Sequence, residues 1–456
     1  MRAVASPPAE SESDTNLSPA RREWAERNLD AAAKALLAED ARYFLHQSVS
    51  TPCLNAIVKA EGIWIEDTAG RRYMDFHGNN VHHIGYGHPR LKRAIAEQMD
   101  ALPFTPRRYA SEPAVALARK LAEIAPGGLG KVLFTTGGSD AVEVAVKLAR
   151  ASTGRYKTLS FWDAFHGAGF GAAAVGGEAL FRASAHGPLM PGAEHVAPFG
   201  SYRCPYGTAT AEESGEACAR MIEYVLAREG DFAAFVAEPI RAVPYVPPPG
   251  FWRRVRAACD RHGTLLVFDE IPTGLGKSGR MFACEHDDVV PDILVLGKAL
   301  GGGILPIAAV IARPELDVGA PYAFGHYTHE KNPVTARAAL TTIEIIEDEG
   351  LVANAARVGA FALERLRQMQ QRHPLIGDVR GRGLVIGAEL VTDRVGKLPA
   401  NAAAEAVMYR ALERGLSFKT TFGNVLTLTP PLTITEAEMT GALDILDACL
   451  GECANR

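Results

Sequence analysis

The stretch Leu265-Leu266-Val267-Phe268-Asp269-Glu270 decides the fold, because it places two acids directly after a short apolar run. A second apolar run, Ile293-Leu294-Val295-Leu296, ends in Gly297-Lys298. Short apolar runs bounded by turn signals are typical of buried strands in a parallel sheet. Ligands of such sheets bind at the carboxyl ends of the strands. We therefore expect one strand to deliver a carboxylate to that edge and the other to deliver an amine.

Lys298 and Asp269 have a specific chemical use as a pair. Pyridoxal phosphate forms a Schiff base with a lysine, and an acid at its ring nitrogen keeps the ring protonated and electron-withdrawing. Taken singly, each residue has a plainer interpretation, as a surface lysine or as a solvated loop acid. The pair therefore gains its weight from the motifs in the rest of the chain.

The composition is that of a soluble globular enzyme. The chain has 456 residues, of which 47% are hydrophobic and 22% charged, enough for about two to three domains. The formal net charge of −5 lacks the basic footprint of a nucleic-acid-binding protein. The seven cysteines are scattered and odd in number, which argues against a disulfide framework and for a reducing cytoplasm. No apolar run reaches the roughly 18 residues of a membrane span.

The order of the expected elements predicts an α/β protein. Residues 1–17 are rich in Ala, Ser, Pro and Glu and are expected to form a disordered tail, since they lack the apolar core of a signal peptide. A helix is expected from Ser18 to about Leu37, and a hairpin over residues 62–76. The strands and helices that follow alternate, which indicates a mostly parallel sheet. They are expected as strands at 132–135, 159–161, 233–237, 265–268 and 293–296, and helices at 89–99, 112–124 and 141–151.

From about Thr342 the pattern changes to that of a smaller α+β domain. We expect a long helix, a strand ending at Leu390, a helix at 402–414, a strand at 425–428 and a final helix at 436–450. The predicted division is a tail at 1–17, an N-terminal segment at 18–100 that contributes to the small domain, a large cofactor-binding domain at 101–341 and the C-terminal small domain at 342–456.

The turn Thr136-Gly137-Gly138-Ser139-Asp140 joins an expected strand to an expected helix. Such a turn makes an anion site from backbone N–H groups and the helix dipole, although Ser139 can equally be an ordinary N-cap. Two rival motifs fail. A hydrolase nucleophile elbow needs a glycine where Ala141 stands, and Gly276-Lys277-Ser278 lacks the first glycine of a P-loop, whose place Ile271 takes.

Two further stretches carry candidate site residues. The loop from His77 to His83 holds three histidines, but His82 and His83 are adjacent and would point apart on a strand. We therefore predict that these rings pack or line a pocket rather than bind a metal. Phe165, after another expected strand, is a candidate for stacking on a flat cofactor or for the core.

As a set, these motifs resemble the class III aminotransferases, pyridoxal-phosphate enzymes with the aspartate-aminotransferase-like fold (fold type I). The resemblance extends from about Phe44 to Ala448. In chain order it is carried by Tyr73-Met74-Asp75, Gly85-Tyr86-Gly87-His88-Pro89, Thr136-Gly137-Gly138-Ser139-Asp140-Ala141, Phe165-His166-Gly167, Glu238-Pro239, Phe268-Asp269-Glu270, Pro291-Asp292, Gly297-Lys298-Ala299-Leu300, Asn332-Pro333 and Arg380-Gly381-Arg382-Gly383.

The resemblance implies a role for each candidate residue. Lys298 would hold the cofactor and shuttle the proton, and Asp269 would pair with the ring nitrogen. Gly138 and Ser139 would bind the phosphate at their helix N-terminus.

Four more residues complete the implied site. Phe165 would stack on the cofactor ring with His166 beside it, and Glu238 would lie in the pocket near the cofactor. Thr328 would reach the phosphate held by the neighbouring subunit. The expected assembly is therefore a homodimer, or a tetramer, with shared active sites and a small-molecule amine as substrate.

Two departures from the family pattern matter, and the second points away from α-amino acids as substrates. The family usually has Val-Gln after the Asp-Glu pair, whereas this chain has Ile271-Pro272, and proline has no side-chain donor for the cofactor's ring oxygen. Many relatives also carry an arginine in the C-terminal strand that binds an α-carboxylate. Thr427 stands there in this chain, and threonine cannot form a bidentate charged pair.

The predicted activity is that of a class III aminotransferase acting on a primary amine without an α-carboxylate. The alternative is elimination of ammonia or phosphate, because segments 77–80, 271–272 and 327–333 resemble a lyase-containing subgroup. Members of that subgroup act on 2-aminoethylphosphonate derivatives or phosphoethanolamine-like amines. A cofactor-free binding protein is disfavoured by the intact pair of Lys298 and Asp269.

Three arginines are candidate phosphonate ligands under the alternative of elimination. They are Arg107, Arg108 and Arg203. For each of them, an ordinary place at the surface or between domains remains open.

Overall fold

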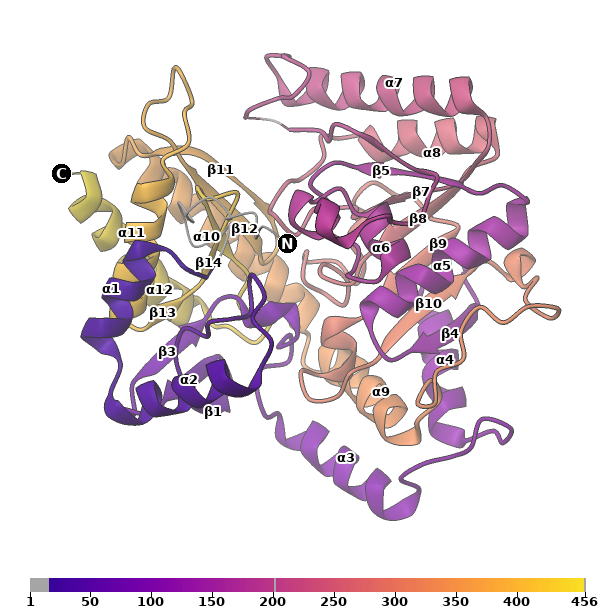
Figure 1. The fold of residues 1–456 in the computed structure, drawn as a ribbon, viewed down its shortest axis with the longest axis horizontal. Helices are drawn as coiled ribbons and strands as arrows, with labels where there is room; N and C mark the ends of the chain where they lie inside the picture. The colour runs from indigo at the N-terminus through magenta and orange to yellow at the C-terminus, as the bar shows by residue number, and fades with distance from the viewer. Residues whose placement is uncertain (1–15, 201, 455–456) are drawn as a thin grey trace. The chain divides into compact units, whose positions relative to one another are not determined.

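The computed structural model describes residues 16–200 and 202–454, and its contacts divide the chain into two compact units (Figure 1). The first unit comprises Met1–Gly78, Gly85–Gly87 and Asn354–Arg456, and the second comprises Asn79–Ile84 and His88–Ala353. The tail expected at residues 1–17 lies outside the described residues except for its last two. None of the described helices is long and apolar enough to cross a bilayer.

A seven-stranded sheet forms the centre of the second unit. Its order is β4 (Lys131–Thr135), β10 (Ala308–Ala312), β9 (Ile293–Leu296), β8 (Leu265–Asp269), β7 (Phe232–Ala237), β5 (Lys157–Phe161) and β6 (Ala193–Val196). Strand β10 is antiparallel to both of its neighbours, and the other paired strands are parallel. The predicted α/β fold with a mostly parallel sheet is confirmed.

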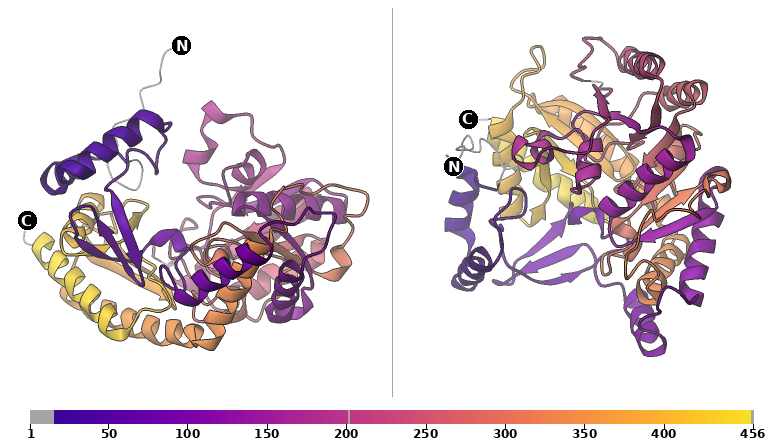
Figure 2. Two further views of the ribbon diagram at one scale, coloured as in Figure 1. Left: turned by 90° about the horizontal axis from the view of Figure 1, so that it is seen from below. Right: turned by 45° about the vertical axis from the view of Figure 1, so that its right-hand side comes forward.

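Helices cover both faces of this sheet, which explains why its strands are continuous apolar runs. Helix α5 (Gly138–Thr153) packs on one face against alternate residues of successive strands, among them Val236, Val267 and Val295. Helix α8 (Phe251–His262) covers the other face, where the ring centroid of Trp252 lies 4.7 Å from that of Phe268. Figures 1 and 2 show helix α7 (Ala211–Glu229) lying beside α8.

Three further helices of the second unit form a group of their own. Helices α3 (Pro89–Ala101) and α4 (Glu112–Ile124) both pack on α9 (Pro333–Asp348). The contacts therefore place α3 in the second unit, whereas our predicted boundary between residues 100 and 101 assigned it to the other domain. Its apolar face is buried against α9, which no local sequence pattern around residue 100 reveals. Helix α6 (Phe170–Val175) packs against α5 and strand β5.

The first unit joins the two ends of the chain in one sheet. Strands β1 (Ile57–Glu61), β2 (Trp64–Asp67) and β3 (Arg72–Asp75) form the expected hairpin region, and β13 (Leu416–Ser417) pairs parallel to β3. A second sheet has the order β11 (Ile376–Arg382), β12 (Val385–Leu390), β15 (Val425–Leu428) and β14 (Lys419–Thr421). Helices α11 (Asn401–Glu413) and α12 (Glu436–Ala454) pack together in this unit.

Two expected helices are each divided in the structure. The helix predicted over 18–37 is two helices, α1 (Pro19–Asn28) and α2 (Ala31–Tyr43), because the side chain of Asp30 accepts a hydrogen bond from the Ala33 N–H at 2.7 Å and starts a new helix. The helix predicted from Thr342 is the end of α9 followed by α10 (Leu351–Arg372). Gly350 separates them with φ 63°, a left-handed conformation that favours glycine.

Candidate functional site

The candidate site lies where strands β7, β8 and β9 end side by side. In the parallel register Ala237 is opposite Phe268, and Asp269 is opposite Val295. Glu238 therefore follows β7 at the level of Asp269, and Lys298 follows β9. Side chains alternate along a strand, so both acids continue the rows that face α5. The strand ends thus bring together the carboxylate and the amine, as the sequence predicts.

Asp269 is a buried carboxylate held by two donors. One oxygen lies 2.8 Å from Nδ1 of His166, and the other accepts a hydrogen bond from the Ile271 N–H at 3.1 Å. Asp269 is only 2% exposed. These bonds fix the plane of the carboxylate while leaving lone pairs for a further donor. His166 thus orients Asp269, a relation that its expected position beside Phe165 did not include.

Lys298 combines an unusual backbone with an altered amine. Its φ is 45°, in the left-handed region that non-glycine residues seldom occupy. Strain of this kind costs about 1–3 kcal/mol and gathers at functional sites. Solvent reaches the side chain, although Gly297 and Ala299 beside it are buried. Desolvation of the amine group by the surrounding protein lowers the pKa of Lys298, although the negative charges of Glu238 and Asp269 act to raise it. A larger fraction of the amine is then neutral near neutral pH, and only the neutral amine can act as a nucleophile or accept a proton.

The start of helix α5 forms a cradle suited to an anion. Its N-cap residue is Gly137, which has no side chain to cap the first N–H groups of the helix. A Cβ atom added to Gly138 would lie 2.8 Å from Cδ1 of Ile271, so only glycine fits there without a shift. The hydroxyl oxygen of Ser139 accepts a bond from the Ala168 N–H at 3.1 Å, which leaves its hydrogen free to donate. Backbone N–H groups, the helix dipole and this hydroxyl are the donor set of a phosphate site.

Two predicted cofactor contacts are exposed in the single chain. Phe165 is 42% exposed, and its ring centroid lies 4.6 Å from that of Phe181. A partly open ring next to the buried His166 is available for stacking. Thr328 is exposed in the loop before α9, as a residue that serves a neighbouring subunit must be. Its role remains a prediction.

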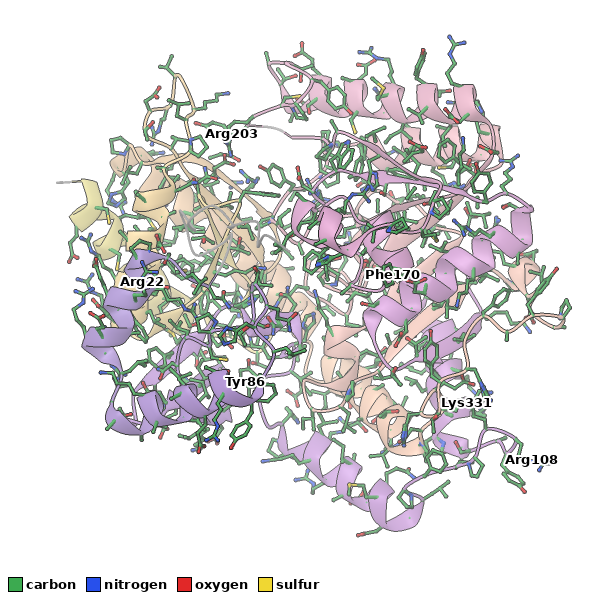
Figure 3. All side chains as sticks on the ribbon, in the orientation of Figure 1. Arg22, Tyr86, Arg108, Phe170, Arg203 and Lys331 are labelled. Atoms are coloured by element: carbon green, nitrogen blue, oxygen red, sulfur yellow. The ribbon has the colours of Figure 1, made fainter. Side chains whose placement is uncertain are left out.

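The three candidate arginines differ in their surroundings. Arg107 forms an ion pair with Glu330 at 3.2 Å, so part of its charge is already matched. Arg108 is exposed and projects from the loop between α3 and α4 (Figure 3). Arg203 is half-buried in the loop before α7. Their proposed contact with substrate therefore stays a prediction.

Arg241 is a structural element of the site that we did not predict from the sequence. It is 3% exposed, and its Nη2 donates to the carbonyl oxygen of Asp163 at 2.6 Å and, at the limit of 3.5 Å, to that of Trp162. These bonds tie the end of β7 to the loop that carries Phe165 and His166. The sequence signal was an arginine immediately after the apolar Pro239-Ile240, but backbone carbonyl partners leave no pattern in a sequence.

In the loop from His77 to His83, the rings of His82 and His83 are buried. His82 and His83 are 0% and 1% exposed, and Nε2 of His83 lies 3.2 Å from the carbonyl oxygen of Gly274. Burial, followed by the charge of Lys277, holds the pKa of His83 well below its ordinary value. Within residues 16–200 and 202–454 there is no group of three or more His, Cys, Asp or Glu residues arranged to hold a metal ion.

Comparisons with known proteins agree with this geometry. The model of the family described as Aminotransferase class-III matches residues 46–450. The (R)-1-hydroxy-2-aminoethylphosphonate ammonia-lyase of Vibrio splendidus is 45% identical and covers 97% of this chain and 95% of its own. The leucine/methionine racemase of Thermococcus litoralis is 40% identical, and the match covers 87% of this chain and 90% of the racemase.

Solved structures show the same fold. The omega transaminase of Pseudomonas jessenii in complex with PMP has a TM-score of 0.87 at 29% identity, covering 92% of this chain and 98% of its own. An amine transaminase from an uncultivated Pseudomonas species, in its PLP-bound form, has a TM-score of 0.84 at 32% identity. The match covers 90% of this chain and 99% of the transaminase.

Proposed function

The chain belongs to the class III aminotransferase family, and from that premise we propose that it releases ammonia, by elimination, from a terminal primary amine that lacks an α-carboxylate. It is a pyridoxal-phosphate-dependent enzyme of fold type I. The amine we propose carries a hydroxyl group on the neighbouring carbon and a phosphonate or phosphate beyond it.

The residues of the second unit fit the cofactor. When bound, pyridoxal phosphate draws electrons from the carbon next to the substrate nitrogen. Lys298, with its lowered pKa, would hold the cofactor and accept the proton from that carbon. Asp269, oriented by His166, would face the ring nitrogen. Gly138 and Ser139 would bind the phosphate.

One observation in the first unit carries the proposed choice of substrate. Thr427 is 1% exposed on β15, and its hydroxyl lies 2.8 Å from that of Thr421. Strand β15 itself therefore supplies no cation at the place where many relatives carry arginine. Lys419 of β14 is the cross-strand partner of Thr427, but its ammonium is a point charge and lacks the bidentate fork of an arginine. Arg380 of the same sheet is already paired with Asp378 and Glu389, at 2.7 Å each. An unmatched buried carboxylate costs about 3–5 kcal/mol, which an amine without an α-carboxylate avoids.

The similarity to the Vibrio splendidus ammonia-lyase over nearly the whole of both chains supports elimination. In the proposed reaction Lys298 takes the proton from the carbon next to nitrogen, and the hydroxyl on the adjacent carbon leaves as water. A second water then hydrolyses the carbon–nitrogen bond. The net products are an aldehyde bearing the phosphonate and ammonia, with one water lost and one gained.

A second candidate is transamination of a terminal amine. Its support is the fold similarity to omega transaminases, with a TM-score of 0.87. The two reactions differ in one requirement, since a transaminase needs a keto-acid acceptor whereas a lyase needs none.

One experiment separates the two reactions. The holoenzyme is incubated with (R)-1-hydroxy-2-aminoethylphosphonate, with and without pyruvate, and ammonia and alanine are measured. We expect ammonia release that does not depend on pyruvate. Alanine formed only with pyruvate would establish the second candidate instead. Lys298→Ala is the control for uncatalysed breakdown, and alanine or glutamate consumed as fast as the best terminal amine would contradict the proposed substrate class.

The proposed assembly is a homodimer in a reducing cytoplasm, in which Thr328 of each subunit completes the phosphate site of the other. The two compact units are proposed as the small and large domains of each subunit. The exposure of Thr328 in the loop before α9 supports the shared site.

A further inference from the structure

Two acids in register lie at the candidate site, and only one of them has a role in holding the cofactor. Glu238 directly follows β7, and Asp269 ends the neighbouring parallel strand β8 at the same level; such strands lie about 4.8 Å apart. Asp269 has two donors, from His166 and Ile271. Among the described residues Glu238 has one, a long bond of 3.4 Å from the Ala242 N–H to Oε1.

We propose that Glu238 is the proton donor to the departing hydroxyl group of the substrate, an inference that rests on the elimination proposed above. Hydroxide is a poor leaving group, so a group that protonates the oxygen as the bond breaks accelerates the reaction by about 10²–10⁴-fold. Asp269 is bonded to His166 and would face the ring nitrogen of the cofactor. Glu238, on the next strand, is the acid left for this step.

The step balances in atoms and electrons. Lys298 takes the proton of the carbon next to nitrogen, and the electron pair of that bond passes into the new carbon–carbon double bond. The pair of the carbon–oxygen bond leaves with the oxygen, which takes the proton of Glu238 and departs as water. Glu238 remains as a carboxylate and regains a proton from solvent.

The charges around Glu238 suit an acid that works near neutrality. The charged groups that act on it come from four neighbouring segments: Asp269 at the end of β8, His166 after β5, Lys298 after β9 and Arg241 after β7. Burial and then the charge of Asp269 raise the pKa of Glu238 to about 7, against the opposing effect of the three other groups. A donor is most effective when its pKa lies near the working pH.

A comparison of leaving groups tests the proposal. The wild type and Glu238→Gln are assayed with (R)-1-hydroxy-2-aminoethylphosphonate and with its 1-fluoro analogue, because fluoride leaves without a proton donor. We expect Glu238→Gln to lose about 10²–10⁴-fold in kcat with the hydroxyl substrate and to stay near wild type with the fluoro compound. For the wild type, kcat with the hydroxyl substrate should fall above pH about 7. The fluoro compound should not show this fall.

A second readout does not depend on turnover. In borohydride-reduced holoenzyme the carboxyl group of Glu238 is followed by difference infrared spectroscopy between wild type and Glu238→Gln. We expect a titration midpoint of about 7.

Each contrary outcome identifies what has failed. Equal losses with both substrates, or a midpoint at the ordinary glutamate value of about 4.3, would overturn the role of Glu238 while leaving the elimination intact. A wild type that releases neither ammonia nor fluoride would overturn the proposed reaction, and the role of Glu238 with it.

Discussion

Replacing Gly138 by alanine tests the anion cradle at the start of α5. The added Cβ would lie 2.8 Å from Cδ1 of Ile271, whereas ordinary contact begins at 3.4 Å, so the two must separate by about 0.6 Å. The added Cβ would also lie 3.6 Å from Cγ2 and 3.7 Å from Cγ1 of Ile271, so it meets the body of that side chain and not only its tip. We expect the helix start to move, and with it the N–H groups that we propose bind the phosphate of the cofactor. Weakening one charged hydrogen bond costs about 1.5–3 kcal/mol, so the Kd for pyridoxal phosphate should rise at least about 10-fold.

The same geometry supplies the compensating change. Ile271→Val removes Cδ1 and should restore cofactor affinity in the double variant to within about threefold of wild type, a coupling of at least about 0.5 kcal/mol. Gly441→Ala is the matched control, since that glycine is helical and has open space around its Cβ position. Affinity is measured by titrating the apoenzyme with cofactor and following absorbance. Normal affinity in Gly138→Ala, or a double variant as weak as Gly138→Ala alone, would refute the reasoning.

Four further predictions follow from the site and the substrate proposal. Borohydride should trap the cofactor on Lys298, and a peptide map with the label on another lysine would contradict its assigned role. Thr427→Arg should shift preference toward α-amino acids, measured as the ratio of kcat/KM values for alanine and the best terminal amine; an unchanged ratio would count against Thr427 as the discriminating residue. The pKa of Glu238 in the native state, about 7, is higher than in the unfolded chain, so the native state retains a proton that the unfolded state loses. The contribution of Glu238 to stability therefore declines as pH rises from about 4.3 to about 7. Between pH 5 and pH 8, Tm should fall less in Glu238→Gln than in wild type, and equal falls in Tm would contradict the raised pKa. Thr328→Ala should weaken cofactor binding in the dimer, and a fully active monomer at high dilution would rule out a shared site.

The pairing of Lys298 with Asp269 could be predicted from sequence because a parallel sheet has only one edge where the carboxyl ends of its strands meet. The cradle at Gly138 and Ser139 was visible for a similar reason, since a glycine turn between a strand and a helix is a local pattern.

Contacts between distant segments had no such signature. His166 and Asp269 are 103 residues apart in sequence, and nothing local to either residue indicates that they bond. The two carbonyl oxygens that Arg241 contacts belong to the backbone, which is the same at every position. Burial against another helix decided that α3 packs with α9, and the chain around residue 100 carries no composition change that marks it.

The antiparallel strand β10 has a consequence for the order in which the site is assembled. It pairs directly with β9, Leu296 opposite Ala309, so the turn that carries Lys298 is closed by a contact only 13 residues apart in the chain. Closing so short a loop costs little conformational entropy, and local contacts of this kind form early in folding. His166 and Asp269, in contrast, meet only after much longer segments have come together. We expect a partly unfolded or loosened chain to retain a well-placed lysine after it has lost the oriented acid. Such a chain would still capture the aldehyde of the cofactor covalently while being catalytically idle, and bound cofactor would then overstate the fraction of competent enzyme.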